Sequence, residues 1–105
     1  MTNITRAVVE AALDSSSAFG WVPAGAKRDR RFVVTTDSVP LGRAVRVIGV
    51  GVTAYDFDGA QVGPIVGSLY QAGQALEAEL RGRWAAGQAD EITAQVAALA
   101  AEIEV

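Results

Sequence analysis

The hydrophobic pattern of the chain is dominated by residues 43–55, RAVRVIGVGVTAY, the longest apolar segment bounded by turn residues. Six of these thirteen residues are β-branched, which favours a strand because branching at Cβ restricts χ1 in a helix. Both alternating faces are mainly apolar, so we expect one strand covered on both sides, or the middle strand of a small sheet. Gly49 and Gly51 share a face, which suggests that a helix lies across it.

The residues before this segment predict one short helix and two strands. Residues 3–14 repeat apolar side chains at helical spacing, and the serines that follow Asp14 end that helix. Residues 19–22 predict a brief strand closed by Pro23, and residues 31–36, RFVVTT, predict a second strand. The turn residues 37–42 then join this strand to 43–55 as an antiparallel hairpin with a long loop.

The apolar spacing becomes helical after residue 63. Pro64 suits the first position of a helix, so we expect a long helix from about Gly63 to about Ala86, with Gly87 as its stop. A start at Asp58, capped with the help of Gln61, would place Pro64 inside the helix at a cost of about 3 kcal/mol.

A second helix is predicted over residues 90–104, with an apolar stripe at spacings of four, three and four that is typical of paired helices. The stripe consists of Ile92, Val96, Leu99 and Ile103. Two packings are open: the helix folds back on the preceding helix, or the stripe forms an oligomer seam with another subunit.

These elements predict a single α+β domain over residues 1–105. It should have a short N-terminal helix and a small, mainly antiparallel sheet of two or three strands. A long helix and a C-terminal helix should pack on that sheet.

Composition narrows the chemistry. The 105 residues include no Cys and no His, which excludes disulfides, a cysteine nucleophile and a Ser-His-Asp triad, and removes the commonest zinc ligand. We therefore expect no enzymatic activity and no cofactor. No run of about 18 apolar residues is present, and the N-terminus lacks the pattern of a secretory signal, so we expect no membrane contact and a cytoplasmic or virion setting.

Charge is divided unevenly along the chain. Residues 1–55 carry seven basic and four acidic side chains, a net charge of +3, whereas residues 56–105 carry two basic and eight acidic ones, a net charge of −6. Opposite halves can attract each other head to tail between copies. Alternatively, each half simply solvates its own surface.

The basic cluster Lys27, Arg28, Arg30 and Arg31 is the candidate partner-binding site. It could be a solvated loop, a contact for an acidic protein, or a nucleic-acid contact with Trp21 stacking on a base. The acidic balance of the chain argues against nucleic acid.

The segment Asp56-Phe57-Asp58-Gly59 resembles the start of a calcium-binding loop, but the sixth position is Gln61 and the twelfth is Gly67, where Gly and Glu are needed. We interpret it as a turn and expect no metal. The glycines form neither a GxGxxG motif nor a P-loop, so phosphate binding is not expected.

Residues 45–59, VRVIGVGVTAYDFDG, leading into residues 64–80, PIVGSLYQAGQALEAEL, resemble the small tail-terminator and neck proteins of long-tailed bacteriophages. The resemblance covers about a third of the chain, brings no catalytic or ligand motif, and does not include residues 90–104. It implies a ring of identical subunits that closes a tail tube, with contacts made by sheet edges and charged loops.

The sequence therefore predicts a non-enzymatic structural or assembly protein that acts as a homo-oligomer. Under the resemblance it would be a phage tail or neck completion component that contacts other virion proteins. The alternative is a monomeric adaptor or binding module that uses the basic loop 27–31 against an acidic partner.

Overall fold

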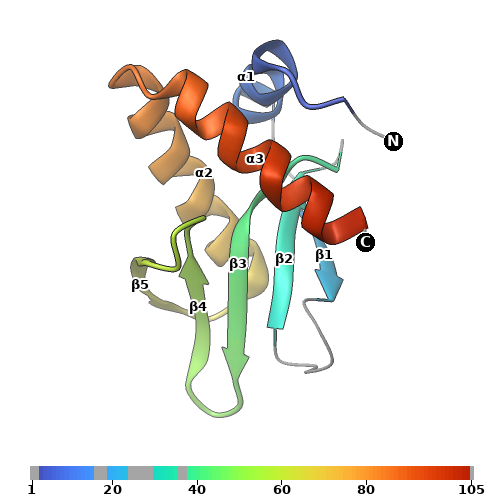
Figure 1. Ribbon diagram of the computed structural model, residues 1–105. Coiled ribbons are helices and arrows are strands. Elements are labelled where there is room, and N and C mark those ends of the chain that lie inside the picture. The colour runs from blue at the N-terminus through green and yellow to red at the C-terminus, as the bar shows by residue number, and fades with distance from the viewer. Residues whose placement is uncertain (1–2, 16–18, 24–29, 36–37, 105) are drawn as a thin grey trace.

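The computed structural model describes residues 3–15, 19–23, 30–35 and 38–104 (Figure 1). Within these ranges the elements are α1 (Arg6–Ser15), β1 (Phe19–Pro23), β2 (Arg30–Thr35), β3 (Pro40–Val47), β4 (Gly51–Tyr55), β5 (Gln61–Val66), α2 (Leu69–Ala85) and α3 (Ala89–Glu104). The predicted α+β class is confirmed, but the sheet has five strands instead of two or three.

The sheet is an antiparallel meander in the order β1-β2-β3-β4-β5, with β1 and β5 at its edges. Residues that pair directly across strands share a face, because side chains alternate along each strand. Phe32, Arg43 and Tyr55 form one such row across β2, β3 and β4. Chain order and spatial order coincide, so each strand is positioned by its neighbour in sequence.

The prediction of one strand over residues 43–55 is wrong, because the chain reverses in the middle of this segment. Gly49 has φ 79° and Gly51 has φ 138°, conformations that L side chains rarely adopt. The backbone N–H of Val50 donates to the carbonyl of Val47 at 3.0 Å and closes the turn. The β-branched residues do form strands, as expected, but they form two strands of a hairpin.

The predicted start of the long helix near Gly63 is also wrong. Residues 61–66 form β5, where Pro64 is tolerated because an edge strand does not need every N–H in the ladder. The helix begins at Leu69, after Ser68, whose side chain accepts from the N–H of Gln71 at 3.2 Å. In return, Gln71 Oε1 accepts from the N–H of Gly67 at 2.9 Å. Reciprocal capping of this kind fixes the helix start.

Two helices, α1 and α3, lie around one end of the sheet, and α2 covers one of its faces. In Figure 1, α2 passes behind β3 and β4, α3 crosses in front of the upper ends of β2 and β3, and α1 lies beside α3 at the top. The β3–β4 hairpin projects from the opposite end. The α2 side is tightly packed, since a Cβ at Gly42 would lie 2.5 Å from the carbonyl oxygen of Tyr55 and 3.0 Å from Leu76 Cδ2.

The core fills the space between α1, α2, α3 and the sheet. Its fully buried side chains include Val9, Val33, Leu41, Leu76, Leu80, Ile92 and Val96. In the described part of the chain, each helix falls short of the length and apolar character that crossing a lipid bilayer requires.

Candidate functional site

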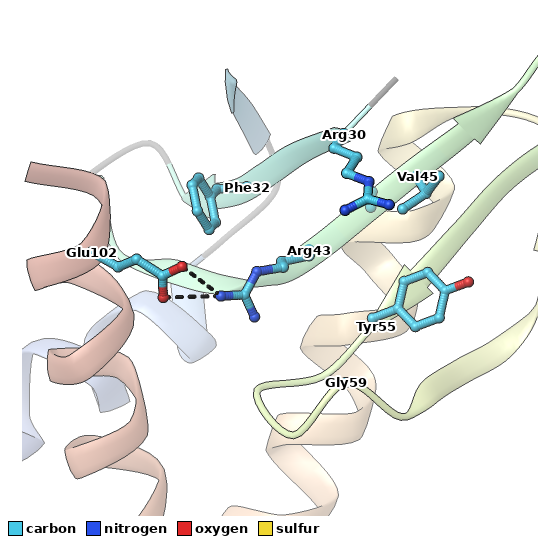
Figure 2. A pocket seen from close by; sticks show the side chains of 8 residues that line it. Arg30, Phe32, Arg43, Val45, Tyr55, Gly59 and Glu102 are labelled. Atoms are coloured by element: carbon cyan, nitrogen blue, oxygen red, sulfur yellow. Dashed lines mark hydrogen bonds and ion pairs between the residues drawn. The ribbon is translucent and has the colours of Figure 1, made fainter. Parts of the chain in front are cut away.

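The face of the sheet opposite α2 holds a cavity of about 560 Å³, drawn in Figure 2. This volume lies within the range of about 300–1,000 Å³ that is usual for ligand sites. The cavity is lined by β2, β3, β4, the turn after β4 and the last turns of α3. Its lining residues are Arg30, Phe32, Arg43, Ala44, Val45, Tyr55, Gly59 and Glu102.

Arg43 lies at the centre of this cavity and is held from two sides. Its Nη2 donates to both carboxylate oxygens of Glu102, at 3.0 and 2.9 Å. Its guanidinium carbon lies 5.3 Å from the centre of the Phe32 ring, within the range of a cation–π interaction. The ion pair joins α3 to the middle of the sheet, and it presents a guanidinium at the cavity floor.

Arg30 brings a second guanidinium to the same face. It pairs with Val45 in the sheet, and Figure 2 shows its side chain extending over Val45 toward Tyr55. Among the described residues, the Arg30 guanidinium has no hydrogen-bond or ion-pair partner. The cavity therefore contains two cations and one carboxylate, a local excess of positive charge on an acidic chain.

A second candidate is an exposed cluster of aliphatic side chains, which we call the apolar tip: Val47, Ile48, Val50 and Ile65. Ile48 is 96% exposed and Val50 is 61% exposed at the β3–β4 turn. Ile65 of β5 adjoins the turn end of the hairpin, since a Cβ at Gly51, the first residue of β4, would lie 2.8 Å from Ile65 Cγ2. Clustered exposed apolar side chains commonly mark interaction surfaces.

The predicted basic cluster is only partly described. Lys27 and Arg28 lie outside the described residues. Arg30 is exposed at the start of β2, and Arg31, next to it, points to the opposite face and donates from Nη1 to the carbonyl of Arg30 at 2.8 Å. The structure therefore places Arg30 with the cavity and Arg31 away from it.

The apolar stripe of α3 packs inside the chain. Ile92 and Val96 are fully buried, Leu99 is 4% exposed and Ile103 is half-buried. Ile92 and Val96 belong to the core formed with α1 and α2. Of the two packings that the sequence left open, the structure has the internal one, so these three buried side chains are not exposed for an oligomer seam.

The acidic turn after β4 has a structural role. Asp56 Oδ1 accepts from the N–H groups of Asp58 and Ala60, both at 2.9 Å, which stabilises the turn. In the described ranges, no three acidic side chains lie close enough together to hold a metal ion.

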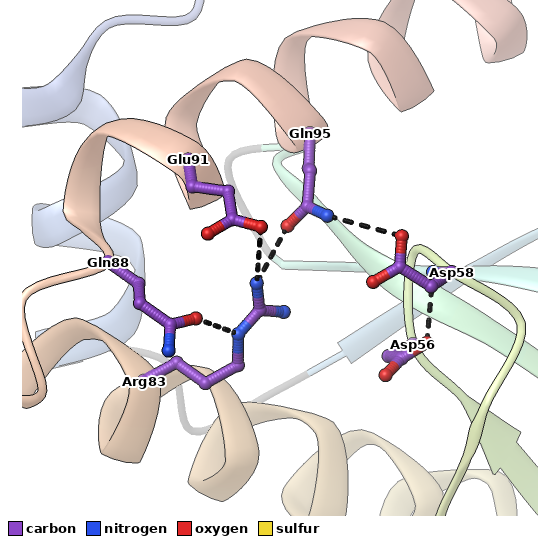
Figure 3. A network of polar contacts seen from close by, with 6 residues as sticks. All are labelled: Asp56, Asp58, Arg83, Gln88, Glu91 and Gln95. Carbon is purple, nitrogen blue, oxygen red and sulfur yellow. Dashed lines mark hydrogen bonds and ion pairs between the residues drawn. The ribbon is translucent and has the colours of Figure 1, made fainter.

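A polar network shown in Figure 3 connects this turn to the helices. Arg83 of α2 donates from Nε to Gln88 Oε1 at 2.8 Å and from Nη2 to Gln95 Oε1 at 3.0 Å. Gln95 in turn donates to Asp58 Oδ1 at 3.5 Å. The network joins α2, α3 and the β4–β5 turn. None of its residues lines the cavity of Figure 2.

A second cavity, of about 470 Å³, lies between α1 and α2. It is lined by Glu10, Leu13, Asp14, Arg81, Trp84 and Ala85. Arg81 donates from Nε to the carbonyl of Leu13 at 2.7 Å and pairs with Glu77 at 2.9 Å. Burial raises the pKa of Glu77, and the neighbouring Arg81 opposes that shift.

The cavity has no local signal in the sequence, because its lining residues come from distant parts of the chain. Interpreted as one strand, residues 43–55 place Arg43 and Tyr55 at opposite ends, whereas the hairpin pairs them directly. The available signal was the Gly-Val-Gly sequence at residues 49–51, which suits a turn as well as a bulge. Nothing in the sequence indicates that Glu102 reaches Arg43.

Comparisons of the chain with protein-family models, with curated proteins and with solved structures find no match. Function is therefore inferred from the chemistry of the described residues.

Proposed function

We propose that this chain is a non-enzymatic assembly protein that acts as a homo-oligomer, and that the apolar tip is a contact surface between copies. One observation carries the proposal: Ile48 and Val50 stand exposed on a projecting hairpin, beside the exposed side chains of Val47 and Ile65. Solvating such a cluster is unfavourable, and burying it against another chain is a favourable source of association free energy.

A head-to-tail contact suits the distribution of charge and apolar surface. The tip is flanked by exposed Arg46. The cavity between α1 and α2 combines half-buried Trp84 with acidic Glu10 and Asp14, and the one cation among the described residues that line it, Arg81, is paired with Glu77. The tip and α1 lie at opposite ends of the molecule (Figure 1), so inserting one into the other repeats in one direction. Such heterologous contacts form closed rings or open filaments, depending on whether the rotation closes.

More specifically, we propose that the chain is a bacteriophage tail or neck completion component that contacts other virion proteins. Its support is the resemblance of residues 45–59 and 64–80 to that class, together with a mode of contact that can generate rings. Negative-stain electron microscopy of the purified chain tests it. Rings of one size are expected, and open filaments of varied length would argue against a tube-closing role.

Native mass by light scattering tests the homo-oligomer. The wild-type chain should form an oligomer of defined mass, the double variant Ile48→Ser/Val50→Ser should lower that mass, and the conservative Ile48→Val should keep it. Circular dichroism should be the same for all three, since both side chains are exposed. A wild-type monomer at every concentration contradicts the homo-oligomer, and a Ser variant of unchanged mass contradicts the tip as the contact.

A second function, binding of an acidic partner by a single chain, is favoured by the exposed and unpartnered guanidinium of Arg30 within the described residues. If the basic segment 27–31 as a whole carries this function, Arg30→Glu and Arg31→Glu should each weaken binding of an acidic polypeptide. Equal binding by both variants and the wild type would exclude it.

A further inference from the structure

We infer that the cavity on the open sheet face is a binding site for an acidic peptide segment of a partner protein. In this site Arg43 and Arg30 bind the peptide's carboxylates, and Phe32 and Tyr55 contact its apolar parts. When no peptide is bound, Glu102 forms an ion pair with Arg43. The inference rests on the second proposed function, binding of an acidic partner, and is independent of the apolar tip.

The sheet register sets the spacing of the two cations. Arg30 pairs with Val45, and Arg43 lies two residues before Val45 on the same strand and face. The two arginines are therefore diagonal neighbours, with side chains that start roughly 7–8 Å apart. This spacing allows each guanidinium to bind a separate carboxylate of one extended acidic segment, or both to approach a single one.

Glu102 shows that a carboxylate fits this site. Both of its oxygens accept from the single atom Nη2 of Arg43. A guanidinium has five N–H donors in a planar fork, and a carboxylate is bound best by two of its nitrogens at once. Because Glu102 uses only one nitrogen of Arg43, an incoming carboxylate can still bind through two guanidinium nitrogens at once.

The Glu102 contact is also weak enough to be displaced. Its side chain is 57% exposed and lies in the last turn of α3. Exposed ion pairs contribute little to stability, because water and salt screen them. A ligand that brings two carboxylates pairs with Arg43 and also with Arg30, which Glu102 does not reach.

The size and walls of the cavity favour a peptide over a bare anion. A volume of about 560 Å³ is far more than a single inorganic anion fills. Phe32, 7% exposed, packs beneath Arg43, and half-buried Val45 and Tyr55 offer apolar surface beside the two cations. Two cations next to apolar surface match acidic side chains next to an apolar one.

Fluorescence anisotropy with the full chain tests the inference. The probe is a fluorescein-labelled peptide with a Glu-Phe-Glu centre, and its control is the same peptide with Gln-Phe-Gln. We expect Arg43→Gln and Arg30→Gln each to weaken binding of the Glu peptide about tenfold. We expect Glu102→Gln to strengthen it about threefold, because the internal competitor is removed while the fold is kept.

Arg31→Gln and Arg46→Gln are matched controls, since both side chains lie on the opposite face, and neither should change the affinity. Loss of binding in Arg31→Gln with full binding in Arg43→Gln would overturn this site while the second proposed function survives. Failure of every variant and of the wild type to bind the Glu peptide would overturn both. Equal binding of the Gln peptide, unchanged affinity in Glu102→Gln, or displacement of the peptide by inorganic phosphate at equal concentration would each overturn the acidic-peptide site.

Discussion

The contact between Phe19 and Gly73 attaches edge strand β1 to α2, and a single methyl group tests it. A Cβ at Gly73 would lie 2.6 Å from Cγ of Phe19 and 2.7 Å from Cδ2, far inside van der Waals contact. The ring also packs against Tyr70, with ring centres 5.6 Å apart, so it is confined on a second side. The substitution Gly73→Ala must therefore displace the ring or the strand that carries it.

Two opposing effects set the size of the change. Replacing Gly by Ala inside a helix raises the free energy of unfolding by about 1 kcal/mol. Overpacking against a ring atom close to its own backbone lowers it by about 1–3 kcal/mol, so the net effect of Gly73→Ala is a loss of about 0–2 kcal/mol. Gly82 is the matched control, because it lies in the same helix with nothing within 4 Å of an added Cβ. Gly82→Ala should therefore gain about 1 kcal/mol.

Urea unfolding followed by circular dichroism measures both variants against the wild type. The expected gap of about 1–3 kcal/mol between Gly82→Ala and Gly73→Ala would be read from the midpoints at a common slope. Equal stabilities for the two variants would mean that Phe19 does not pack on Gly73, and the position of β1 against α2 would have to be abandoned.

Three polar contacts can be tested in the same assay. Burial raises the pKa of the Glu77 carboxyl above its usual value of 4.5, so the folded chain binds the carboxyl proton more tightly than the unfolded chain does. The stability that Glu77 contributes should therefore fall as pH rises from about 4.5 through the raised folded pKa. Glu77→Gln should flatten the plot of stability against pH in this range, and an unchanged slope would contradict the raised pKa. Arg83→Met should cost about 1–3 kcal/mol, because the amides of Gln88 and Gln95 lose a charged donor, whereas Arg46→Met, exposed on the sheet, should change stability by less than about 0.5 kcal/mol. Asp56→Ala should cost about 1–2 kcal/mol, because it leaves two backbone N–H groups without their acceptor. Asp56→Asn keeps an oxygen acceptor and should retain most of the stability. Equal losses in the two variants would show that the negative charge of Asp56 matters more than its hydrogen bonds.

Local patterns predicted the elements whose signals are contained in their own residues. The helices α1 and α3 and the strands β1 and β2 lie within a few residues of their expected positions. The apolar pattern of α1 ends at serines and that of β1 ends at Pro23, and none of the four elements contains a competing signal. Gly87, with φ 92°, follows α2 as expected of a helix stop.

The errors arose where two local signals competed. Pro64 suits a helix start and an edge strand equally well, and only pairing with β4 decides between them. The sequence Ser68-Leu69-Tyr70-Gln71 contained the capping pair that begins α2, five residues beyond the predicted start. In residues 43–55, the β-branched residues outweighed the two glycines in the prediction, although in the folded chain the glycines determine the path.

The same errors are the reason why the sequence did not predict the candidate sites. With residues 43–55 as one covered strand, Ile48 and Val50 belong to the core, whereas the hairpin places them among the most exposed apolar side chains. The pairing of Arg43 with Tyr55 follows from the same turn, but the contact with Glu102 depends on how α3 crosses the sheet. Such a contact between residues 59 positions apart has no local signature in the sequence.

The positions of the helices make the two proposed surfaces independent of each other. Leu76 and its neighbours in α2 cover one face of the sheet, and α3 covers only the upper end of the other, where Glu102 meets Arg43 (Figures 1 and 2). The apolar tip projects at the opposite end, beyond any helix. An oligomer built through the tip should therefore keep its peptide sites open, and Ile48→Ser/Val50→Ser should bind the Glu-Phe-Glu peptide as tightly as the wild-type chain does. A parallel loss of native mass and peptide affinity would instead mean that the cavity is completed by the neighbouring copy.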